Sequence, residues 1–268
     1  MSSQVQTLLA PRSVAIVGAS ANRQKLGNIV LRNIKDGGYT GRLYPVNPNE
    51  NSIEGLQSYN QYVHIPEIPD LAVIVVPAAI VAPVLREVGQ KGTRAVVVIS
   101  AGFKEEGREG AVREAELQEI VREYDITLLG PNCLGFVNTR RRLNATFGQK
   151  ILNKGDMHFL SQSGAIASSL FDWAEHHDIG FEDFITMGNK AGITENDFLM
   201  YWHDQIRSKQ KDDKKFNESG YAPIGMYLES LADGTTFIEV ASAVANHTHL
   251  FLLKTGRTPA AKTAMKHN

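Results

Sequence analysis

Short runs of apolar residues alternate with longer amphipathic stretches along the first half of the chain. Most runs hold four to six apolar residues without polar alternation, which is typical of parallel strands buried on both faces. Strands are predicted at residues 13–17, 43–46, 71–76, 95–99 and 127–129, and helices at about 25–35, 79–90 and 110–124. The first half is therefore predicted to be a βαβ array.

The same alternation resumes after a polar connection at residues 143–155. Strands are predicted at 157–160, 184–186, 223–228 and 250–253, and helices at about 165–176, 195–205 and 235–246. A boundary near residue 147 divides the chain into two α/β units, residues 1–146 and 147–268. The hydrophilic stretch 207–221 is interpreted as a solvated surface insertion, with a regulatory or partner-binding loop as the alternative.

The charge of the chain does not favour a polyanionic partner. Lys and Arg number 28 against 29 Asp and Glu, so nothing in the net charge of −1 points to nucleic acid or an anionic membrane. Cys133 is the single cysteine and cannot form an internal disulfide, and the N-terminus lacks the features of a secretory signal. The apolar runs are far shorter than the roughly 20 residues that span a bilayer. A cytoplasmic location is expected.

The first strand runs into a small-residue turn, Gly18-Ala19-Ser20, before a helix. Such a turn directs backbone N–H groups and the positive end of the helix at an anion, usually phosphate. A dinucleotide fingerprint would need Gly at positions 18, 20 and 23, and this chain has Ser20 and Arg23 at the last two. The second strand also ends in Asn47 instead of the acidic residue that holds a ribose. NAD is therefore disfavoured, and a tight turn without a ligand is the alternative. Arg23 and Lys25 add positive charge beside the turn.

Each predicted strand of the first half ends in small or turn-forming residues. These ends are 17–20, 46–48, 75–78, 99–103 and 129–133. The carboxyl ends of parallel strands share one edge of a sheet, so the five turns together predict a long shallow groove.

Nearly the whole chain resembles the NDP-forming acyl-CoA synthetases, relatives of the succinyl-CoA synthetase α subunit. Their arrangement also forms the N-terminal part of Pat-type protein lysine acetyltransferases. In the first half the matching phrases are LLAPRSVAIVGAS at 8–20, YPVNP at 44–48, DLAVIVVPA at 70–78, VVVISAGFKEEG at 96–107 and LLGPNCLGFVN at 128–138. In the second half they are FLSQSGAIASSL at 159–170, MGNKAGITENDFL at 187–199, MYLESLADGTTF at 226–237 and LLKTGRTPAAKTAM at 252–265. The resemblance implies a Rossmann-like CoA-binding domain followed by a flavodoxin-like α/β domain of the succinyl-CoA synthetase type.

The resemblance also implies which residues bind CoA. The 3′-phospho-ADP end would lie at Gly18, Ala19, Ser20 and Lys25, with Val46, Asn47 and Pro48 flanking the nucleotide. The pantetheine arm would pass Val76, Pro77 and Ala78, and the thiol end would lie near Gly130, Pro131 and Asn132.

A second strand–loop–helix turn, Ser161-Gln162-Ser163-Gly164, offers another anion site. It suits an acyl-phosphate or a phosphohistidine, and an ordinary helix N-cap by Ser161 or Ser163 is the alternative. The family passes a phosphoryl group from acyl-phosphate through a histidine to ADP or GDP. By resemblance Glu229 orients that histidine, with a strand-end acid in a turn as the alternative.

The reactive histidine departs from the family pattern. An ungapped comparison places His267 where the family has Ser and Asn268 where it has His, so a slip of one residue makes His267 the phosphoacceptor. Residues 258–266 are predicted to be a helix without a stop signal, which favours a fragment that ends within the second domain. The ATP-grasp domain that binds ADP or ATP with Mg²⁺ is expected in a partner or a further region, and no metal site is predicted here.

The sequence favours the CoA-binding part of an acid–thiol ligase that acts on a small carboxylic acid, and it allows a homo-oligomer. An acyl-CoA-sensing module of a Pat-type acetyltransferase, without phosphoryl transfer, is the main alternative. A CoA- or nicotinamide-binding protein without chemistry of its own is the third possibility.

Overall fold

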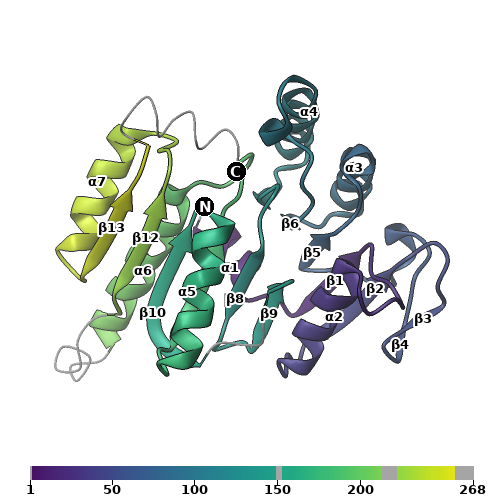
Figure 1. Cartoon of the computed structure of the whole chain (residues 1–268), viewed down its shortest axis with the longest axis horizontal. Helices are drawn as coiled ribbons and strands as arrows, with labels where there is room; N and C mark the ends of the chain where they lie inside the picture. Colours follow the sequence, from purple (N-terminus) through teal and green to yellow (C-terminus); the bar gives the residue numbers. More distant parts are fainter. Residues whose placement is uncertain (1, 149–152, 213–221, 257–268) are drawn as a thin grey trace.

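The described residues form two large β-sheets that lie side by side, each covered by helices (Figure 1). The computed structural model describes residues 2–148, 153–212 and 222–256. The prediction of two α/β units with parallel strands is confirmed.

The first sheet has five parallel strands in the order β2-β1-β5-β6-β7. The strands are β1 (Ser13–Val17), β2 (Arg42–Val46), β5 (Leu71–Ile74), β6 (Ala95–Val98) and β7 (Thr127–Leu129). The helices of this part are α2 (Leu26–Asp36), α3 (Val81–Lys91) and α4 (Arg108–Tyr124). Every residue of β1, β5 and β6 is buried, which explains why these strands have no polar alternation.

The connections of the first sheet contain several short elements. They are the hairpin β3 (Ser52–Ile53) and β4 (Leu56–Gln57), and the 3₁₀ turns η1 (Tyr62–His64), η2 (Ala78–Ile80) and η3 (Lys104–Glu106).

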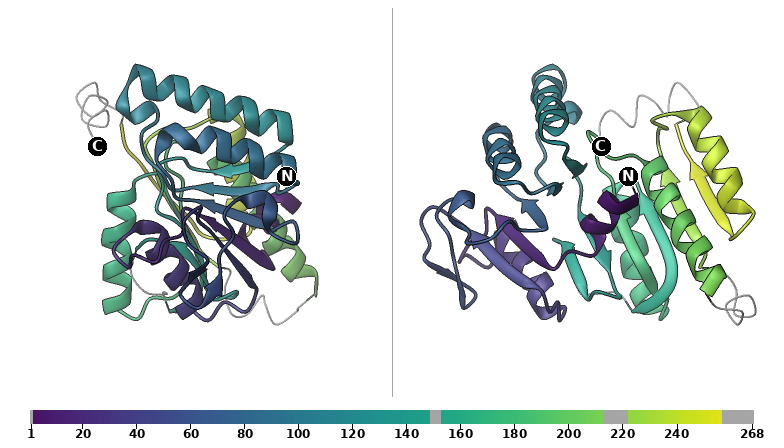
Figure 2. Two further views of the ribbon diagram at one scale, coloured as in Figure 1. Left: turned by 90° about the vertical axis from the view of Figure 1, so that its right-hand side faces the viewer. Right: turned by 180° about the vertical axis from the view of Figure 1, so that it is seen from behind.

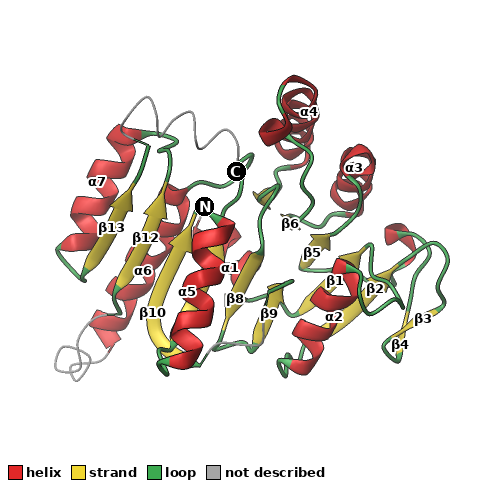
Figure 3. Cartoon of the chain, in the orientation of Figure 1, coloured by secondary structure: helices red, strands yellow, loops and turns green. Residues whose placement is uncertain are grey.

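The second sheet has six strands in the order β13-β12-β10-β11-β8-β9. Its parallel strands are β10 (Lys154–Ser161), β11 (Phe181–Thr186), β12 (Ile224–Leu228) and β13 (Leu250–Lys254). Its helices are α5 (Gly164–His176), α6 (Glu195–Asp212) and α7 (Gly234–Ala245). Helix α6 packs beside α7 on one face, and α5 covers the other (Figures 2 and 3).

An antiparallel hairpin that the sequence did not predict completes this sheet. Strands β8 (Gly135–Asn138) and β9 (Leu143–Thr146) pair with each other, and β8 pairs antiparallel with β11. The prediction of a polar connection from residue 143 was wrong for 143–146, because these residues are fully buried and Asn33 of α2 donates to Thr146 O at 2.8 Å. The chain thus changes sheet between Leu129 and Gly135.

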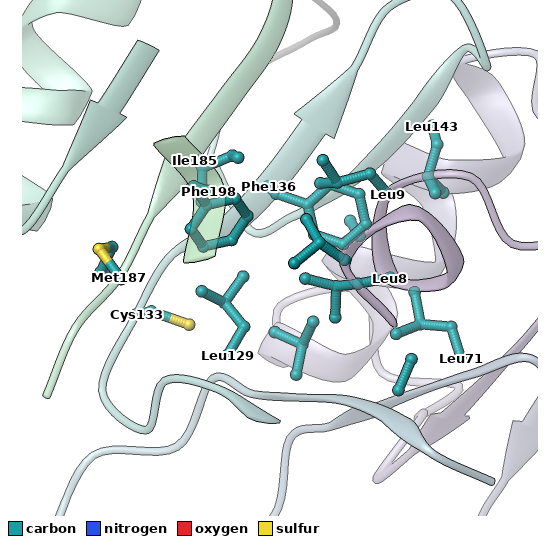
Figure 4. Packing of buried hydrophobic residues seen from close by; sticks show 14 of the residues in the cluster. Leu8, Leu9, Leu71, Leu129, Cys133, Phe136, Leu143, Ile185, Met187 and Phe198 are labelled. Carbon is teal, nitrogen blue, oxygen red and sulfur yellow. The ribbon is translucent and has the colours of Figure 1, made fainter. Parts of the chain in front are cut away.

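The N-terminal helix α1 (Ser2–Leu9) joins the cores of the two sheets. Leu8 and Leu9 have no exposed surface and belong to one cluster with Phe136 and Phe198 (Figure 4). This cluster also contains residues of β1, β5 and β6 on one side and of β10, β11 and β12 on the other. The two sheets therefore share one hydrophobic core, with their strand-end loops close together.

Candidate functional site

A cavity of about 1590 Å³ lies where the loops of the two sheets meet. Loops after β1, β2, β5 and β6 line it from the first sheet, and loops after β10, β11 and β12 line it from the second. The structure therefore places the predicted groove and the turn at residues 161–164, predicted as a second anion site, around one cavity.

Most of the residues singled out from the sequence line this cavity. They are Gly18, Ser20, Lys25, Asn47, Pro48, Val76, Pro77, Asn132, Gln162, Ser163, Gly164 and Glu229. Six others lie next to these residues in the chain without lining it: Ala19, Ala78, Gly130 and Pro131 in the connections, and Val46 and Ser161 at the ends of β2 and β10. His267 lies outside the described residues.

The first glycine turn allows a very close backbone approach. Gly18 has φ +91°, and a Cβ at this position would lie 2.2 Å from Val75 O. Helix α2 follows the turn, and no side chain caps its N-terminus at Lys25. Leu26 and Gly27, the first residues of the helix, line the cavity. Uncapped N–H groups and the positive helix end suit a phosphate at this point.

Two asparagines hold the glycine turn in place. Asn47 Nδ2 donates to Ala19 O at 2.6 Å, and Asn28 Nδ2 donates to Ser20 O at 2.6 Å. Arg23 pairs with Glu54 at 3.3 Å, and this hydrogen bond lowers the pKa of the Glu54 carboxyl. Arg23 is therefore engaged on the surface, whereas Lys25 lines the cavity.

The second turn is both a helix cap and part of the cavity wall. Ser163 Oγ accepts from Ile166 N at 3.4 Å at the start of α5, and Ser161 Oγ donates to Ser163 O at 2.7 Å. Ser161 is fully buried, so its hydroxyl supports the turn from behind. Gly164 and Ala165, the first residues of α5, line the cavity.

Gln162 fastens this turn to the loop after β12. Its Oε1 accepts from the backbone N–H groups of Glu229 and Ser230, both at 3.0 Å, and its Nε2 donates to Ser230 Oγ at 3.0 Å. Lys254 Nζ donates to Glu229 O at 2.8 Å from the other side. The backbone position of Glu229 is thus fixed by two side chains.

The Glu229 side chain lines the cavity near the start of α5. Burial raises the pKa of this carboxyl, and the opposing charges of Lys190 and Lys254 only partly offset the effect. A raised pKa is typical of a carboxyl group that exchanges a proton or orients a partner at a functional site.

The match to known families decides the identity of this fold. A CoA binding domain covers residues 12–139, and a succinyl-CoA ligase like flavodoxin domain covers residues 154–268. The chain belongs to the NDP-forming acyl-CoA synthetase family.

Individual family members are similar over almost the whole chain. The ADP-forming acetate–CoA ligase I of Archaeoglobus fulgidus is 40% identical, over 98% of this chain and 36% of its own length. The alpha subunit of the Pyrococcus furiosus ADP-forming acetate–CoA ligase I is 39% identical, over 98% of this chain and 55% of its own length. The chain therefore spans about a third to a half of these relatives.

A solved structure agrees with the assignment. The dinucleotide-forming acetyl-coenzyme A synthetase 1 of Candidatus Korarchaeum cryptofilum, in complex with phosphate and ADP, superposes with a TM-score of 0.88. It is 34% identical, and the match covers 100% of this chain and 55% of that chain. These similarities give no support to the alternative of a Pat-type acetyltransferase module.

The cavity of this synthetase-family chain also contains a polar cluster to which the sequence analysis assigned no role. Lys104, Glu105 and Asn189 line the cavity and interact across the two sheets. Burial alone would raise the pKa of Glu105, but hydrogen bonds from Asn189 and from the backbone of Gly102 and Phe103 outweigh it and lower the pKa. The phrases AGFKEEG and MGNK were the only signal in the sequence, because the pairing depends on the fold.

His158, Glu182 and Asp183 form the one group of described residues with ligand atoms close enough to hold a metal, within 4.8 Å of one another. Their atoms already have partners: Asp183 accepts from Asn138 at 2.8 Å and lies 2.9 Å from His158, and Glu182 pairs with Arg140 at 2.7 Å. The group is a buried polar network inside the second domain and does not fit a Mg²⁺ site.

Within the described ranges, none of the helices has the length and apolar character needed to cross a membrane.

Proposed function

We propose that this chain is the CoA-binding portion of an NDP-forming acyl-CoA synthetase. The enzyme would interconvert acyl-CoA, phosphate and ADP with a carboxylic acid, CoA and ATP. The observation that carries the proposal is the single cavity that runs from the uncapped start of α2 to the start of α5 beside Glu229. Its volume of about 1590 Å³ exceeds the roughly 300–1,000 Å³ of common ligand pockets, as a long ligand such as CoA requires.

The first sheet would bind the carrier. The uncapped amides of α2 and the Lys25 ammonium are suited to the phosphates of CoA, and Gly18 permits the close approach that they need. The pantetheine arm would then pass Val76 and Pro77 toward Asn132, which carries the thiol to the second sheet.

The second sheet would handle the phosphoryl group. Phosphate attacks the thioester carbonyl, the C–S bond breaks, and acyl-phosphate and the CoA thiolate form. A histidine nitrogen then attacks phosphorus and releases the carboxylate, and ADP accepts the phosphoryl group from this phosphohistidine. In this proposal His267 is the phosphoacceptor, Glu229 orients it, and the amides at the start of α5 stabilise the phosphoryl oxygens.

The nucleotide and its Mg²⁺ would come from an ATP-grasp domain or β-type subunit. The proposal fits the Pyrococcus relative, which is named as an alpha subunit. A cytoplasmic location, a small carboxylic acid as substrate and a homo-oligomer belong to the same proposal. So does a division of the sequence into residues 1–146 and 147–268, in which the last hairpin of the first part, β8–β9, pairs with the sheet of the second part.

The decisive experiment separates binding from chemistry. Calorimetric titration of the chain with CoA and with NAD should give saturable binding for CoA alone, and a preference for NAD would contradict the glycine-turn argument.

Incubation of the complete enzyme with acetyl-CoA and labelled phosphate should label a histidine in this chain. His267→Asn should abolish the label, whereas the matched variant His176→Asn, on the exposed end of α5, should keep it. A label that survives His267→Asn would assign the phosphoryl group elsewhere.

A further inference from the structure

The loop between β11 and α6 belongs to the second sheet by connectivity, but its backbone forms hydrogen bonds with the end of the first sheet. Three backbone bonds of 2.9 Å join Asn189 N to Pro131 O, Ala191 N to Gly130 O and Ile193 N to Leu128 O. A Cβ on Gly188 would lie 2.2 Å from Pro131 O, so the approach of the two backbones requires glycine there. The loop at residues 188–193 therefore lies against the end of β7 and the turn that follows it.

The side chain of Asn189 bridges two carboxylates of the first domain. Its Nδ2 donates to Glu105 Oε2 at 2.6 Å and to Glu114 Oε2 at 2.7 Å, so both hydrogens of the amide are used. Lys104 pairs with Glu114 at 3.0 Å and also donates to the Asn189 carbonyl. Asn189 is only 8% exposed and Glu114 only 4%, so solvent replaces these bonds poorly.

The next residue, Lys190, binds the loop that carries Glu229. Lys190 Nζ donates to Ser230 O at 2.9 Å and pairs with the fully buried Glu195 at 3.1 Å. Glu195 in turn accepts from Ala232 N at 2.6 Å. Lys190, with its backbone in the left-handed region at φ +59°, thus contacts Ser230 and Glu195, whereas its neighbour Asn189 contacts carboxylates of the first domain.

Two consecutive residues thus connect the two halves of the cavity. We propose that Asn189 is a positioning residue: by bridging Glu105 and Glu114 it sets the distance between the CoA-binding loops and the Glu229 loop. The inference rests on the proposed ligase function. Its physical basis is that the thioester carbon and the phosphoryl acceptor must meet within a narrow range of distance, so a displacement of about 1 Å costs on the order of 100-fold in rate.

The test is steady-state kinetics of acyl-CoA formation by the complete enzyme. Asn189→Ala should lower kcat by about 10- to 100-fold and leave the KM for CoA within about threefold, because CoA still binds to an intact first sheet. Asn189→Ser keeps a hydroxyl that can donate to only one carboxylate, so its kcat should be intermediate. The matched control is Asn138→Ala, which also removes a buried amide–carboxylate bond, at 2.8 Å to Asp183, but within the second sheet. Its kcat should stay near that of the wild type.

Each outcome decides the inference. Wild-type kcat in Asn189→Ala, or equal losses in Asn189→Ala and Asn138→Ala, would overturn it, because the residue would then have no special role in positioning. If Asn189→Ala does not fold, Asn189→Ser against the same control applies the same criterion. An inactive wild-type enzyme that still binds CoA would contradict the proposed function itself, which is a different result from an active enzyme indifferent to Asn189.

Discussion

The backbone of Gly18 lies directly against Gly27 at the start of α2, so closely that a Cβ on Gly27 would be only 2.0 Å from Gly18 O. This contact brings the first turn of the helix directly behind the glycine turn of β1. Gly27→Ala should therefore displace the turn, with a loss of about 1–3 kcal/mol in the free energy of unfolding and at least about tenfold weaker CoA binding. Urea unfolding and calorimetry measure the two effects. Gly234→Ala, at the start of α7, is the control because the nearest atom lies 4.0 Å from the added Cβ. Unchanged CoA affinity in Gly27→Ala would contradict a phosphate site at this turn.

Lys25 is expected to contribute charge to CoA binding. Lys25→Ala should weaken the binding about tenfold, which corresponds to about 1.4 kcal/mol for a hydrogen bond with a charged group. The difference from wild type should shrink as KCl is raised, since salt screens exposed charges. Lys35→Ala removes a lysine from the other end of the same helix, where its Nζ donates to Glu54 O, and should leave the affinity unchanged. Equal effects of the two substitutions would mean that Lys25 makes no specific contact.

Glu229 should make the stability depend on pH with an unusual sign. Burial raises its pKa in the folded state, so the native protein binds more protons than the unfolded chain between the ordinary pKa and the raised value. Stability from this group is thus present at low pH and falls as the pH rises through that window. Glu229→Gln should stabilise the protein near neutral pH, with the gain vanishing toward pH 4. Urea unfolding at several pH values measures the difference.

Asp233 provides a control for that experiment, because its effect on stability should change with pH in the opposite direction. Hydrogen bonds from the Thr236 hydroxyl and backbone N–H lower the pKa of this helix-capping carboxyl. Its contribution is present above the ordinary pKa and is lost as the pH falls, so Asp233→Asn should destabilise near neutral pH and have little effect in acid. The same sign for both variants would show that local charge does not govern the Glu229 effect.

Leu8 should be important for the stability of the whole fold, although it lies in a short N-terminal helix. It has no exposed surface in the core shared by both sheets, so Leu8→Ala should lower the free energy of unfolding by about 2–5 kcal/mol. Gln6→Ala, on the exposed side of α1, should change it by less than about 0.5 kcal/mol. Similar unfolding midpoints for the two variants would mean that α1 does not stabilise the shared core.

The glycine turn shows how far the sequence could predict the site. Gly18, Ser20 and Lys25 were identified because a strand, a small-residue turn and a helix are adjacent in the chain, and all three line the cavity. Gln162 was identified in the same way, but its bonds to the Glu229 loop cross 67 and 68 residues and could not be read from the local pattern. The hairpin β8–β9 was missed since its partly polar residues are buried only through contacts with α2 and β11.

The sequence by itself determined the parallel strands, the small-residue turns at their ends and the resemblance to the synthetase family, because these features depend on residues close together in the chain. Tertiary structure alone decided that the turns of two sheets share one cavity, that α1 links their cores and that Asn189 lies between Glu105 and Glu114. The physical reason is that burial and hydrogen-bond partners are properties of the packed chain. A carboxylate or an amide gains its role only when a distant segment removes water from it and supplies a partner.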